Sequence, residues 1–264
     1  MCTAVAALES GVITPTTIIE DRGVYTYYKD PQPACWIWRQ ARMTHGRINV
    51  SQAIVDSCNY FYYEVGRLTG IKKLDEYATA FGLGQSTGIE IGDVSGVLAS
   101  PEWAEAHDRE WTDGQTITAA IGQSYNAFTP LQLANYVATL INGGDRYKAH
   151  LLKTVKSSDN SKILYQYEPE VVKTVPLAQD AYDAIKTGMG QVIEADKIKE
   201  FDNLQDRGIK VGCKTGTAEV GTARPKLYNA LFVAFAPYDD PEIAVCTVVE
   251  KSPSQGASTA AITD

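Results

Sequence analysis

The chain has 264 residues, of which 44% are hydrophobic and 21% charged, a composition typical of a globular protein with one large domain or two small ones. The formal net charge of −8 and the absence of a lysine- and arginine-rich run argue against a nucleic-acid-binding surface. The five cysteines include no C-x-x-C pair, and no segment approaches the ~20 apolar residues of a membrane-spanning helix.

The first half of the chain is predicted to be mainly helical. Gly11 ends an N-terminal helix, Asn49 is a good helix cap, and Gly82 ends a helix whose apolar residues recur at helical spacing. The elements expected here are, in order, the end of a helix over 1–9, short strands and turns over 12–48, a helix over 49–56, a helical run from residue 60, a helix over 71–81, a short strand over 89–94 and a polar connection over 95–120.

The second half is predicted to end in strands. Thr129-Pro130 is a strong helix start, and Gly143-Gly144 ends that helix. Helices followed by a terminal group of antiparallel strands favour an α+β fold over a doubly wound βαβ fold. The later elements expected are strands and loops over 145–176, a helix after Pro176, strands over 208–219, 229–236 and 242–250, and turns at Gly221–Lys226 and Pro237–Pro241.

The strand-like run over 209–213 leads into Lys214-Thr215-Gly216-Thr217. Lys214 supplies a positive charge, and the hydroxyls of Thr215 and Thr217 would share one face of a strand. Gly216 lets a ligand approach the backbone closely. Such a strand could bind a carboxylate and offer a backbone N–H to a developing oxyanion. A K-T-G tripeptide alone is a modest signal.

A second motif, Ser57-Cys58-Asn59, gives this strand a candidate catalytic partner. S-x-N and K-T-G occur in serine acyl-transfer enzymes together with an S-x-x-K that supplies the nucleophile. The serine of S-x-N can relay a proton to the leaving group, and its asparagine can hydrogen-bond a lysine or a substrate amide. One S-x-N triplet is expected by chance about once in such a chain, as a cap or turn. Its combination with K-T-G favours an acyl-transfer site.

Two other patterns are weaker. Gly84-Gln85-Ser86-Thr87-Gly88 matches the G-x-S-x-G nucleophile elbow of α/β-hydrolases, but the elbow needs a strand before the serine and a helix after it. The expected order here is the reverse, so a helix-to-strand turn is preferred. His45, with Cys35 and Asp21, could in principle build a metal site, but no ligand spacing supports one, and we predict no metal.

Several stretches run in the order found in one known family, over nearly the whole chain. They are Leu8–Ile13, Ser57–Tyr62, Phe81–Gly84, Thr87–Ile89, Gly122–Gln123, Thr129–Ala134, Asn142–Gly144, Lys214–Glu219 and Phe235–Pro237. With these stretches the chain resembles the transpeptidase domain of class B, high-molecular-weight penicillin-binding proteins of the elongation-type and sporulation-type branch. The set is far more specific than either triplet alone.

The resemblance implies a β-lactamase/transpeptidase-like α+β fold, an antiparallel sheet flanked by helices with a helical subdomain. We expect one incomplete transpeptidase domain over 1–264, mainly helical over roughly 49–145, with the sheet meander over 205–250. The implied activity is D,D-transpeptidation, which cross-links peptidoglycan stem peptides ending in D-Ala-D-Ala through a serine acyl-enzyme that β-lactams trap. No metal or organic cofactor is implied.

The resemblance also implies roles for individual residues. Ser57 would be the proton-shuttle serine, and Asn59 would help to orient the lysine and the substrate. Lys214 would supply positive charge near Ser57. The Thr215–Thr217 segment would bind substrate, with its threonines contacting the carboxylate of the substrate or lactam and the N–H of Thr217 as an oxyanion donor.

One departure from the family matters, because no S-x-x-K occurs in these 264 residues. In the family this motif begins the helix whose remainder would be Met1–Glu9, so its lysine would fall just before Met1. We therefore expect a chain truncated at both ends, with the first two sheet strands missing, 242–250 as an unpaired edge, and the last helix starting near Ser258–Asp264. Without the attacking serine, the chain as written should be catalytically inactive.

Two alternatives remain open. One is a non-catalytic pseudoenzyme or sensor that binds penicillin, peptidoglycan stems or a partner. The other is a serine β-lactamase or D,D-carboxypeptidase of the same fold, although Tyr60–Tyr63 and Thr129–Gln132 favour the class B transpeptidase. The resemblance suggests a parent protein anchored at the extracytoplasmic face of the bacterial plasma membrane, beside a membrane glycan polymerase. The expected ligands are stem peptides and β-lactams, with no nucleic acid.

Overall fold

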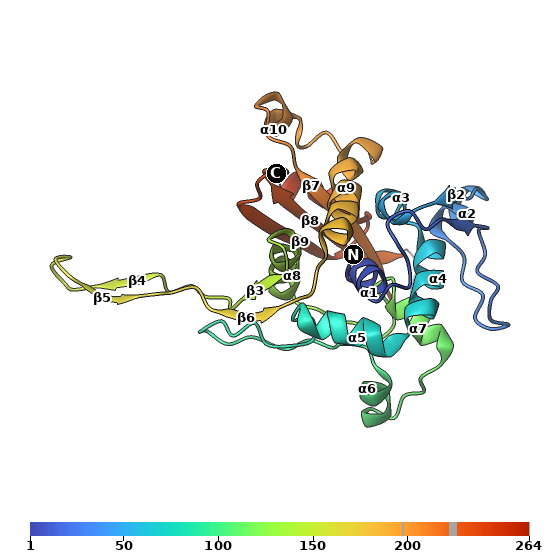
Figure 1. Ribbon diagram of the computed structural model, residues 1–264, viewed down its shortest axis with the longest axis horizontal. Coiled ribbons are helices and arrows are strands. Elements are labelled where there is room, and N and C mark those ends of the chain that lie inside the picture. The colour runs from blue at the N-terminus through green and yellow to red at the C-terminus, as the bar shows by residue number, and fades with distance from the viewer. Residues whose placement is uncertain (197, 222–225, 264) are drawn as a thin grey trace.

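The computed structural model describes residues 1–196, 198–221 and 226–263 (Figure 1). Its helices are α1 (Cys2–Glu9), α2 (Trp36–Ala41), α3 (Val50–Val55), α4 (Asn59–Thr69), α5 (Ile71–Ala80), α6 (Pro101–Ala106), α7 (Asp113–Ala119), α8 (Pro130–Ile141), α9 (Gln179–Ala195), α10 (Asp202–Asp206), the 3-10 helix η1 (Gly256–Thr259) and α11 (Ala260–Thr263). Its strands are β1 (Ile19–Asp21), β2 (Gly46–Ile48), β3 (Asp145–Tyr147), β4 (Thr154–Lys156), β5 (Ile163–Gln166), β6 (Val171–Thr174), β7 (Gly212–Val220), β8 (Leu227–Ala236) and β9 (Ile243–Ser252). None of the helices described is long and apolar enough to cross a membrane.

The last three strands form an antiparallel sheet in the order β7-β8-β9, which confirms the predicted meander and the α+β class. In the register, Lys214 lies opposite Val233, which lies opposite Cys246. Among the described residues β9 pairs with β8 alone and is an edge of this sheet. The turn expected at Gly221–Lys226 includes residues 222–225, which lie outside the described part of the chain.

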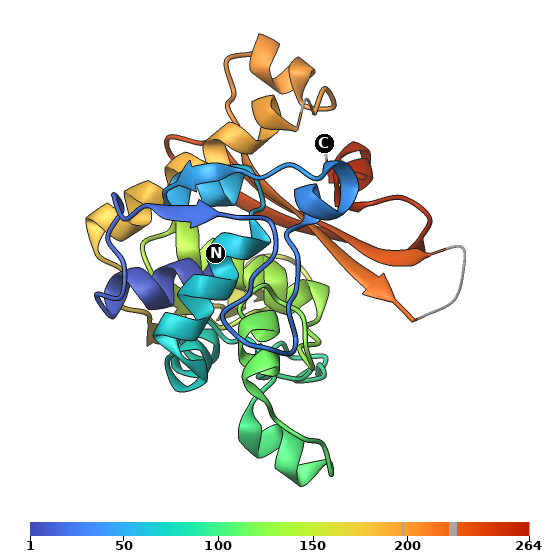
Figure 2. The same ribbon diagram turned by 90° about the vertical axis from the view of Figure 1, so that its right-hand side faces the viewer.

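Both faces of the sheet are buried, because alternate residues of β8 belong to two different apolar clusters. Val233 and Phe235 pack into the main core with apolar residues of α1, α3, α4 and α8. Phe232 and Ala234 face a smaller cluster that includes Phe201 and reaches α11. In Figure 2 the sheet, orange to red, accordingly runs between the helical body and the C-terminal helix.

The predicted helix starts are confirmed where the cap lies in the local sequence. Asn49 caps α3 and Thr129 caps α8, each in a capping box with a glutamine three residues later. Gln132 of the second box is buried, and its Nε2 also donates to the carbonyls of Gln85 at 2.5 Å and Ser95 at 2.8 Å. This cap therefore ties α8 to the loop that follows α5.

Four local expectations were wrong or incomplete. Residues 89–94 form turns rather than a strand, because the carboxylate of Asp93 binds the N–H and the hydroxyl of Thr87. The connection over 95–120 contains α6 and α7, which begin at cap residues Ser100 and Thr112. Residues 12–48 contain the short helix α2 as well as strands, and α10 was not expected. Helices of five to seven residues give too little periodicity to predict from pattern.

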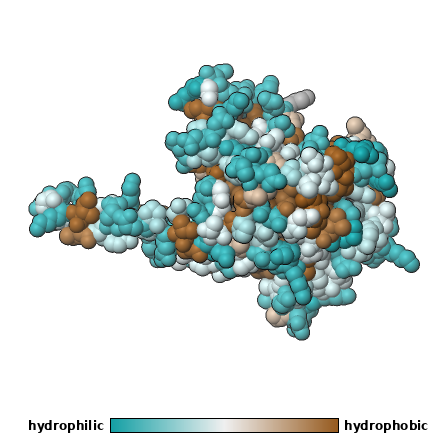
Figure 3. All heavy atoms as spheres, in the orientation of Figure 1, coloured by the Kyte–Doolittle hydropathy of each residue, from teal (hydrophilic) through white to brown (hydrophobic). Residues whose placement is uncertain are grey.

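The expected strands over 145–176 form an arm. Strand β3 pairs with β6 and β4 with β5, both antiparallel, and the β4–β5 hairpin extends far from the body of the molecule (Figure 1). All four residues of β5 are exposed, including three apolar ones, and brown side chains stand out on the arm in Figure 3. Among the described residues, β4 and β5 pack mainly against each other.

Candidate functional site

Ser57 lies in the tight turn that joins α3 to α4. Its N–H donates to the carbonyl of Ile54 at 3.3 Å, and its φ of 50° is in the left-handed region that non-glycine residues seldom adopt. Cys58 then caps α4, with its sulfur accepting a hydrogen bond from the N–H of Phe61. A serine in a strained conformation between two helices suggests a functional position.

The side chain of Lys214, near the start of β7, reaches the Ser57 turn. Its Nζ donates to Ser57 Oγ and, at 3.2 Å, to the carbonyl of Thr215. Burial lowers the pKa of Lys214, and the charge of Asp196 at the end of α9 acts in the opposite direction. An amine with a lowered pKa beside a hydroxyl can exchange a proton with it, so the pair can serve as a proton relay.

The rest of the K-T-G strand is held from two sides. The hydroxyl of Thr215 donates to Asp196 Oδ2 at 3.4 Å, and Thr217 Oγ1 accepts from the N–H of Gly256 at 3.0 Å. Gly256 packs so closely that a Cβ on it would lie 2.1 Å from the carbonyl oxygen of Gly216. Sequence reasoning missed Asp196 and Gly256, because no local pattern links either residue to the strand.

Asn59, the first residue of α4, is half-buried. Among the described residues, the hydrogen bonds of Lys214 go to Ser57 and Thr215, and none goes to Asn59. The structure thus gathers Ser57, Lys214 and Thr215 and leaves Asn59 beside them. The role of Asn59 in orienting the lysine stays a prediction.

The sequence contains two further S-x-N triplets, at 124–126 and 158–160. Asn126 accepts a hydrogen bond from the N–H of Ala99, and residues 158–160 lie between β4 and β5 at the tip of the arm (Figure 1). Within the described residues, Ser57 is the serine that contacts Lys214. The fold therefore selects one triplet from three equal sequence matches.

The G-x-S-x-G match at 84–88 is structural. Ser86 Oγ donates to Asp93 Oδ1 at 2.6 Å and accepts from the N–H of Gly88 at 3.1 Å. The segment follows α5 and continues as turns, with no strand before the serine and no helix directly after it in the described chain. The geometry of a nucleophile elbow is absent from this segment.

Asp21, Cys35, His45 and Cys58 form a second cluster, directly behind the Ser57 turn. One ligand atom of each lies within 4.8 Å of the others, with 2.8 Å between His45 Nδ1 and Asp21 Oδ2 and 3.9 Å between the two sulfurs. Two sulfurs, an imidazole nitrogen and a carboxylate oxygen are donors that Zn²⁺ takes in four-coordinate sites. The residues present can hold such an ion. The fold brings Cys58 to the three residues considered from the sequence, which makes this cluster a candidate metal site although their spacing had not supported one.

Contacts within the cluster shift the pKa values of Cys35 and His45. Hydrogen bonding with Cys58, followed by that with His45, lowers the pKa of the Cys35 thiol despite its burial. Burial alone would lower the pKa of His45, but its contacts with Cys35 and Asp21 raise it. Because Cys58 lies between Ser57 and Asn59, whatever orders this cluster also orders the S-x-N turn.

The fold brings together S-x-N and K-T-G, two motifs that occur together in penicillin-binding proteins. Residues 1–264 match the family described as penicillin binding protein transpeptidase domain, and the chain belongs to this family. This confirms the resemblance read from the sequence.

Named relatives give a finer comparison. The chain is 33% identical over 276 residues to peptidoglycan D,D-transpeptidase MrdA of Haemophilus influenzae, covering 98% of this chain and 41% of the relative. It superposes on Pseudomonas aeruginosa PBP2 in complex with WCK 5153 with a TM-score of 0.81 at 29% identity, covering 99% and 57%. A solved structure described as the coordination of polymerization and crosslinking by a peptidoglycan synthase complex superposes with a TM-score of 0.77 at 26% identity. The superposition covers 99% of this chain and 43% of the other. The chain thus spans about two fifths of the curated relative's length.

Proposed function

We propose that this chain belongs to the transpeptidase domain of an elongation-type peptidoglycan D,D-transpeptidase. The observation that carries the proposal is the contact between Nζ of Lys214, on the K-T-G strand, and Oγ of Ser57, in the S-x-N turn. The similarity to MrdA over 98% of the chain supports the same substrate class. The whole protein would cross-link stem peptides that end in D-Ala-D-Ala through a serine acyl-enzyme, which β-lactams trap.

In this proposal each site residue has one task. Ser57 passes a proton between Lys214 and the leaving amine or lactam nitrogen, for which their hydrogen bond is suited. Lys214 supplies the positive charge that favours a carboxylate-bearing substrate at this end of β7. Asn59 orients the substrate amide. The Thr215–Thr217 segment binds the substrate carboxylate and offers the N–H of Thr217 to the oxyanion.

The nucleophile is the part of this chemistry that these 264 residues do not supply, since none of their serines stands in an S-x-x-K motif. We propose that the longer protein carries that motif upstream and that the chain as given forms no acyl-enzyme. The remaining groups would still form the binding pocket, but without the nucleophilic serine no covalent bond to the substrate can form.

The proposed setting is the extracytoplasmic face of the bacterial plasma membrane, with the whole protein anchored there. The similarity to a synthase complex that coordinates polymerization and crosslinking supports a membrane glycan polymerase as partner. The expected ligands of the site itself are stem peptides and β-lactams.

Intact-mass spectrometry after incubation with a labelled penicillin tests the function. The chain as given is compared with a version extended upstream through the S-x-x-K, and circular dichroism checks that both are folded. An adduct on the extended protein alone supports the proposal. An adduct on the 264-residue chain would identify one of its own serines as the nucleophile. No adduct on either folded protein would instead favour a non-catalytic binding module.

A further inference from the structure

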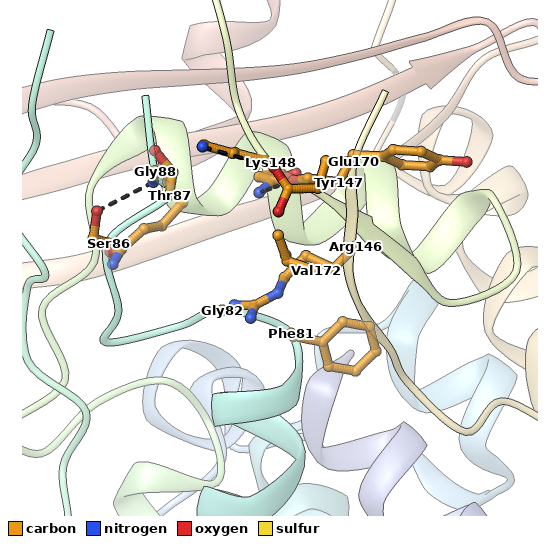
Figure 4. Close-up of a pocket in the computed structure, with 12 residues that line it drawn as sticks. Phe81, Gly82, Ser86, Thr87, Gly88, Arg146, Tyr147, Lys148, Glu170 and Val172 are labelled. Carbon is orange, nitrogen blue, oxygen red and sulfur yellow. Dashed lines mark hydrogen bonds and ion pairs between the residues drawn. The ribbon is translucent and has the colours of Figure 1, made fainter. Parts of the chain in front are cut away.

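A cavity of about 340 Å³ lies where β3 and β6 leave the body of the molecule (Figure 4). Its walls come from the loop after α5, from α8 and from both strands. No residue of β7 or of the Ser57 turn lines it, so it is distinct from the acyl-transfer site. Ser86, Thr87 and Gly88 of the G-x-S-x-G segment, which has no role in the acyl-transfer site, form one of its walls.

Two cations, Arg146 and Lys148, line this cavity from one side of the β3 segment. Each packs over a glycine with positive φ, Gly82 at 85° and Gly88 at 79°. A Cβ on Gly82 would lie 2.4 Å from Arg146 Nη1, and one on Gly88 would lie 3.1 Å from Lys148 Cγ. The positive φ values favour glycine at both positions, and the absence of a Cβ lets both cationic side chains pack closely against this wall.

Arg146 lacks an anionic partner in the described part of the chain. Its Nη1 donates to Gln85 Oε1 at 3.1 Å, but its Nε is buried with no acceptor, and burial lowers the pKa of the guanidinium. A buried donor without an acceptor is unfavourable, and a guanidinium is best satisfied by a carboxylate or phosphate. Arg146 lines the cavity without an ion pair among the described residues, so its guanidinium is available to an anion that enters the cavity.

Lys148 adds to this positive charge. The carboxylate of Glu170 is 3.7 Å from Lys148 Nζ, and both side chains are substantially exposed, so their pairing is weak. Glu170 is the acidic residue among those that line the cavity, which leaves two cations against one carboxylate. An excess of positive charge stands out in a chain with a net charge of −8.

Exposed apolar side chains also lie among the polar ones of the arm that continues from the cavity. Val172 lines the cavity and is 44% exposed, and Leu151, Ile163 and Leu164 are 61–66% exposed (Figure 3). Exposed apolar side chains beside an anion site suit a peptide segment with mixed side chains better than a sugar or a free ion.

We propose that this cavity binds the carboxylate of an aspartate or glutamate in a segment of a partner protein, whose neighbouring apolar side chains lie along the arm. Arg146 makes the main contact and Lys148 contributes long-range attraction. The proposal is independent of the acyl-transfer function, because the two sites share no residue.

Two blocked tripeptides test it, acetyl-Leu-Asp-Leu-amide and its Asn counterpart, titrated into the ¹⁵N-labelled 264-residue protein and followed by NMR. The aspartyl peptide should shift the amide signals of Gly82, Gly88 and Lys148. The asparaginyl peptide should bind at least about ten-fold more weakly, as expected for losing a charge-assisted hydrogen bond. Equal binding of the two peptides, or binding by neither at millimolar concentration, would overturn the proposal.

Variants assign the effect to the cavity. Arg146→Gln should weaken binding by about ten-fold or more, Lys148→Gln by about two- to three-fold, and Lys199→Gln, exposed and outside the arm, not at all. Arg146→Lys keeps the positive charge but loses the planar guanidinium that can bind a carboxylate through two N–H groups. Its affinity for the aspartyl peptide should lie between those of wild type and Arg146→Gln, and it remains informative if Arg146→Gln fails to fold. Unchanged affinity in a folded Arg146 variant contradicts the assignment. If a soluble stem peptide binds through Arg146 and the aspartyl peptide does not, the proposal of a protein partner is wrong and the ligand of this cavity is peptidoglycan.

Discussion

Lys214 Nζ donates a hydrogen bond to Ser57 Oγ across 157 residues of sequence. The strand end that carries the lysine and the turn that carries the serine come from different parts of the fold, and each is held independently, by the β7–β8 ladder and by the helix ends of α3 and α4. The pair is therefore preorganised, which is the property that a proton relay needs.

The first prediction concerns this pair in a version of the protein extended upstream through the proposed S-x-x-K. Lys214→Ala should lower the second-order rate of β-lactam acylation by about 10²- to 10⁴-fold, the range for losing a positioned proton-transfer group. Ser57→Ala should have an effect of similar size, and the double variant should be little worse than either, because the residues act as a unit. Stopped-flow acylation measures this, with the exposed Lys210→Ala as control. Fully additive losses would show that the two residues act separately.

The second prediction concerns metal content. Protein purified without chelators should contain about one zinc per chain, bound by Asp21, Cys35, His45 and Cys58. Elemental analysis measures the zinc, and a strong chelator should lower Tm because bound metal stabilises the folded state. Cys58→Ala should abolish zinc binding, whereas Cys246→Ala, in β9, should retain it. Zinc-free protein with an unchanged Tm after zinc addition would refute the site.

The third prediction concerns Asp75 in α5. Burial, followed by the charge of Glu102, raises the pKa of Asp75 to about 7, against about 3.9 in an unfolded chain. Between these values the folded protein keeps a proton that the unfolded chain releases, so the stability from Asp75 is full below about pH 4 and is lost as pH rises through about 7.

Asp75→Asn removes this loss. Because the side chain is only partly buried, the gain at pH 8 should be about 1 kcal/mol, or about 2–4 °C in Tm. At pH 4 the variant should show no gain. Thermal unfolding at both pH values measures the difference, with the exposed Asp206→Asn as control. An equal gain at both pH values would point to a cause other than titration.

The fourth prediction concerns the cap of α8. Thr129→Ala removes the side chain that accepts from the N–H of Gln132 at 3.1 Å and should cost about 1 kcal/mol. Thr129→Ser keeps the acceptor and should be close to wild type. Denaturant unfolding compares the two variants, and equal losses would mean that the threonine methyl group, not the cap, is responsible.

Much of the fold was readable from local patterns. The caps at Asn49 and Thr129, the glycine that ends α1 and the three-strand meander were predicted correctly, because a cap or an apolar period is formed by residues close in sequence. The short helices α2, α6, α7 and α10 were missed, since one or two turns carry little periodicity and depend on packing. The family was also readable, because its motifs keep their order along the chain.

The sites built from residues far apart in the sequence could not be predicted from local patterns. Three S-x-N triplets look alike in the sequence, and the fold places Ser57 against Lys214. The thiol of Cys58 joins Asp21, Cys35 and His45 although 37 residues separate Cys58 from Asp21, and Arg146 meets the loop of Gln85 across 61 residues. Such sites arise where packed elements bring side chains within a few ångströms of one another. No repeat or spacing in the chain encodes that distance, because it is set by the burial of apolar faces elsewhere in the core.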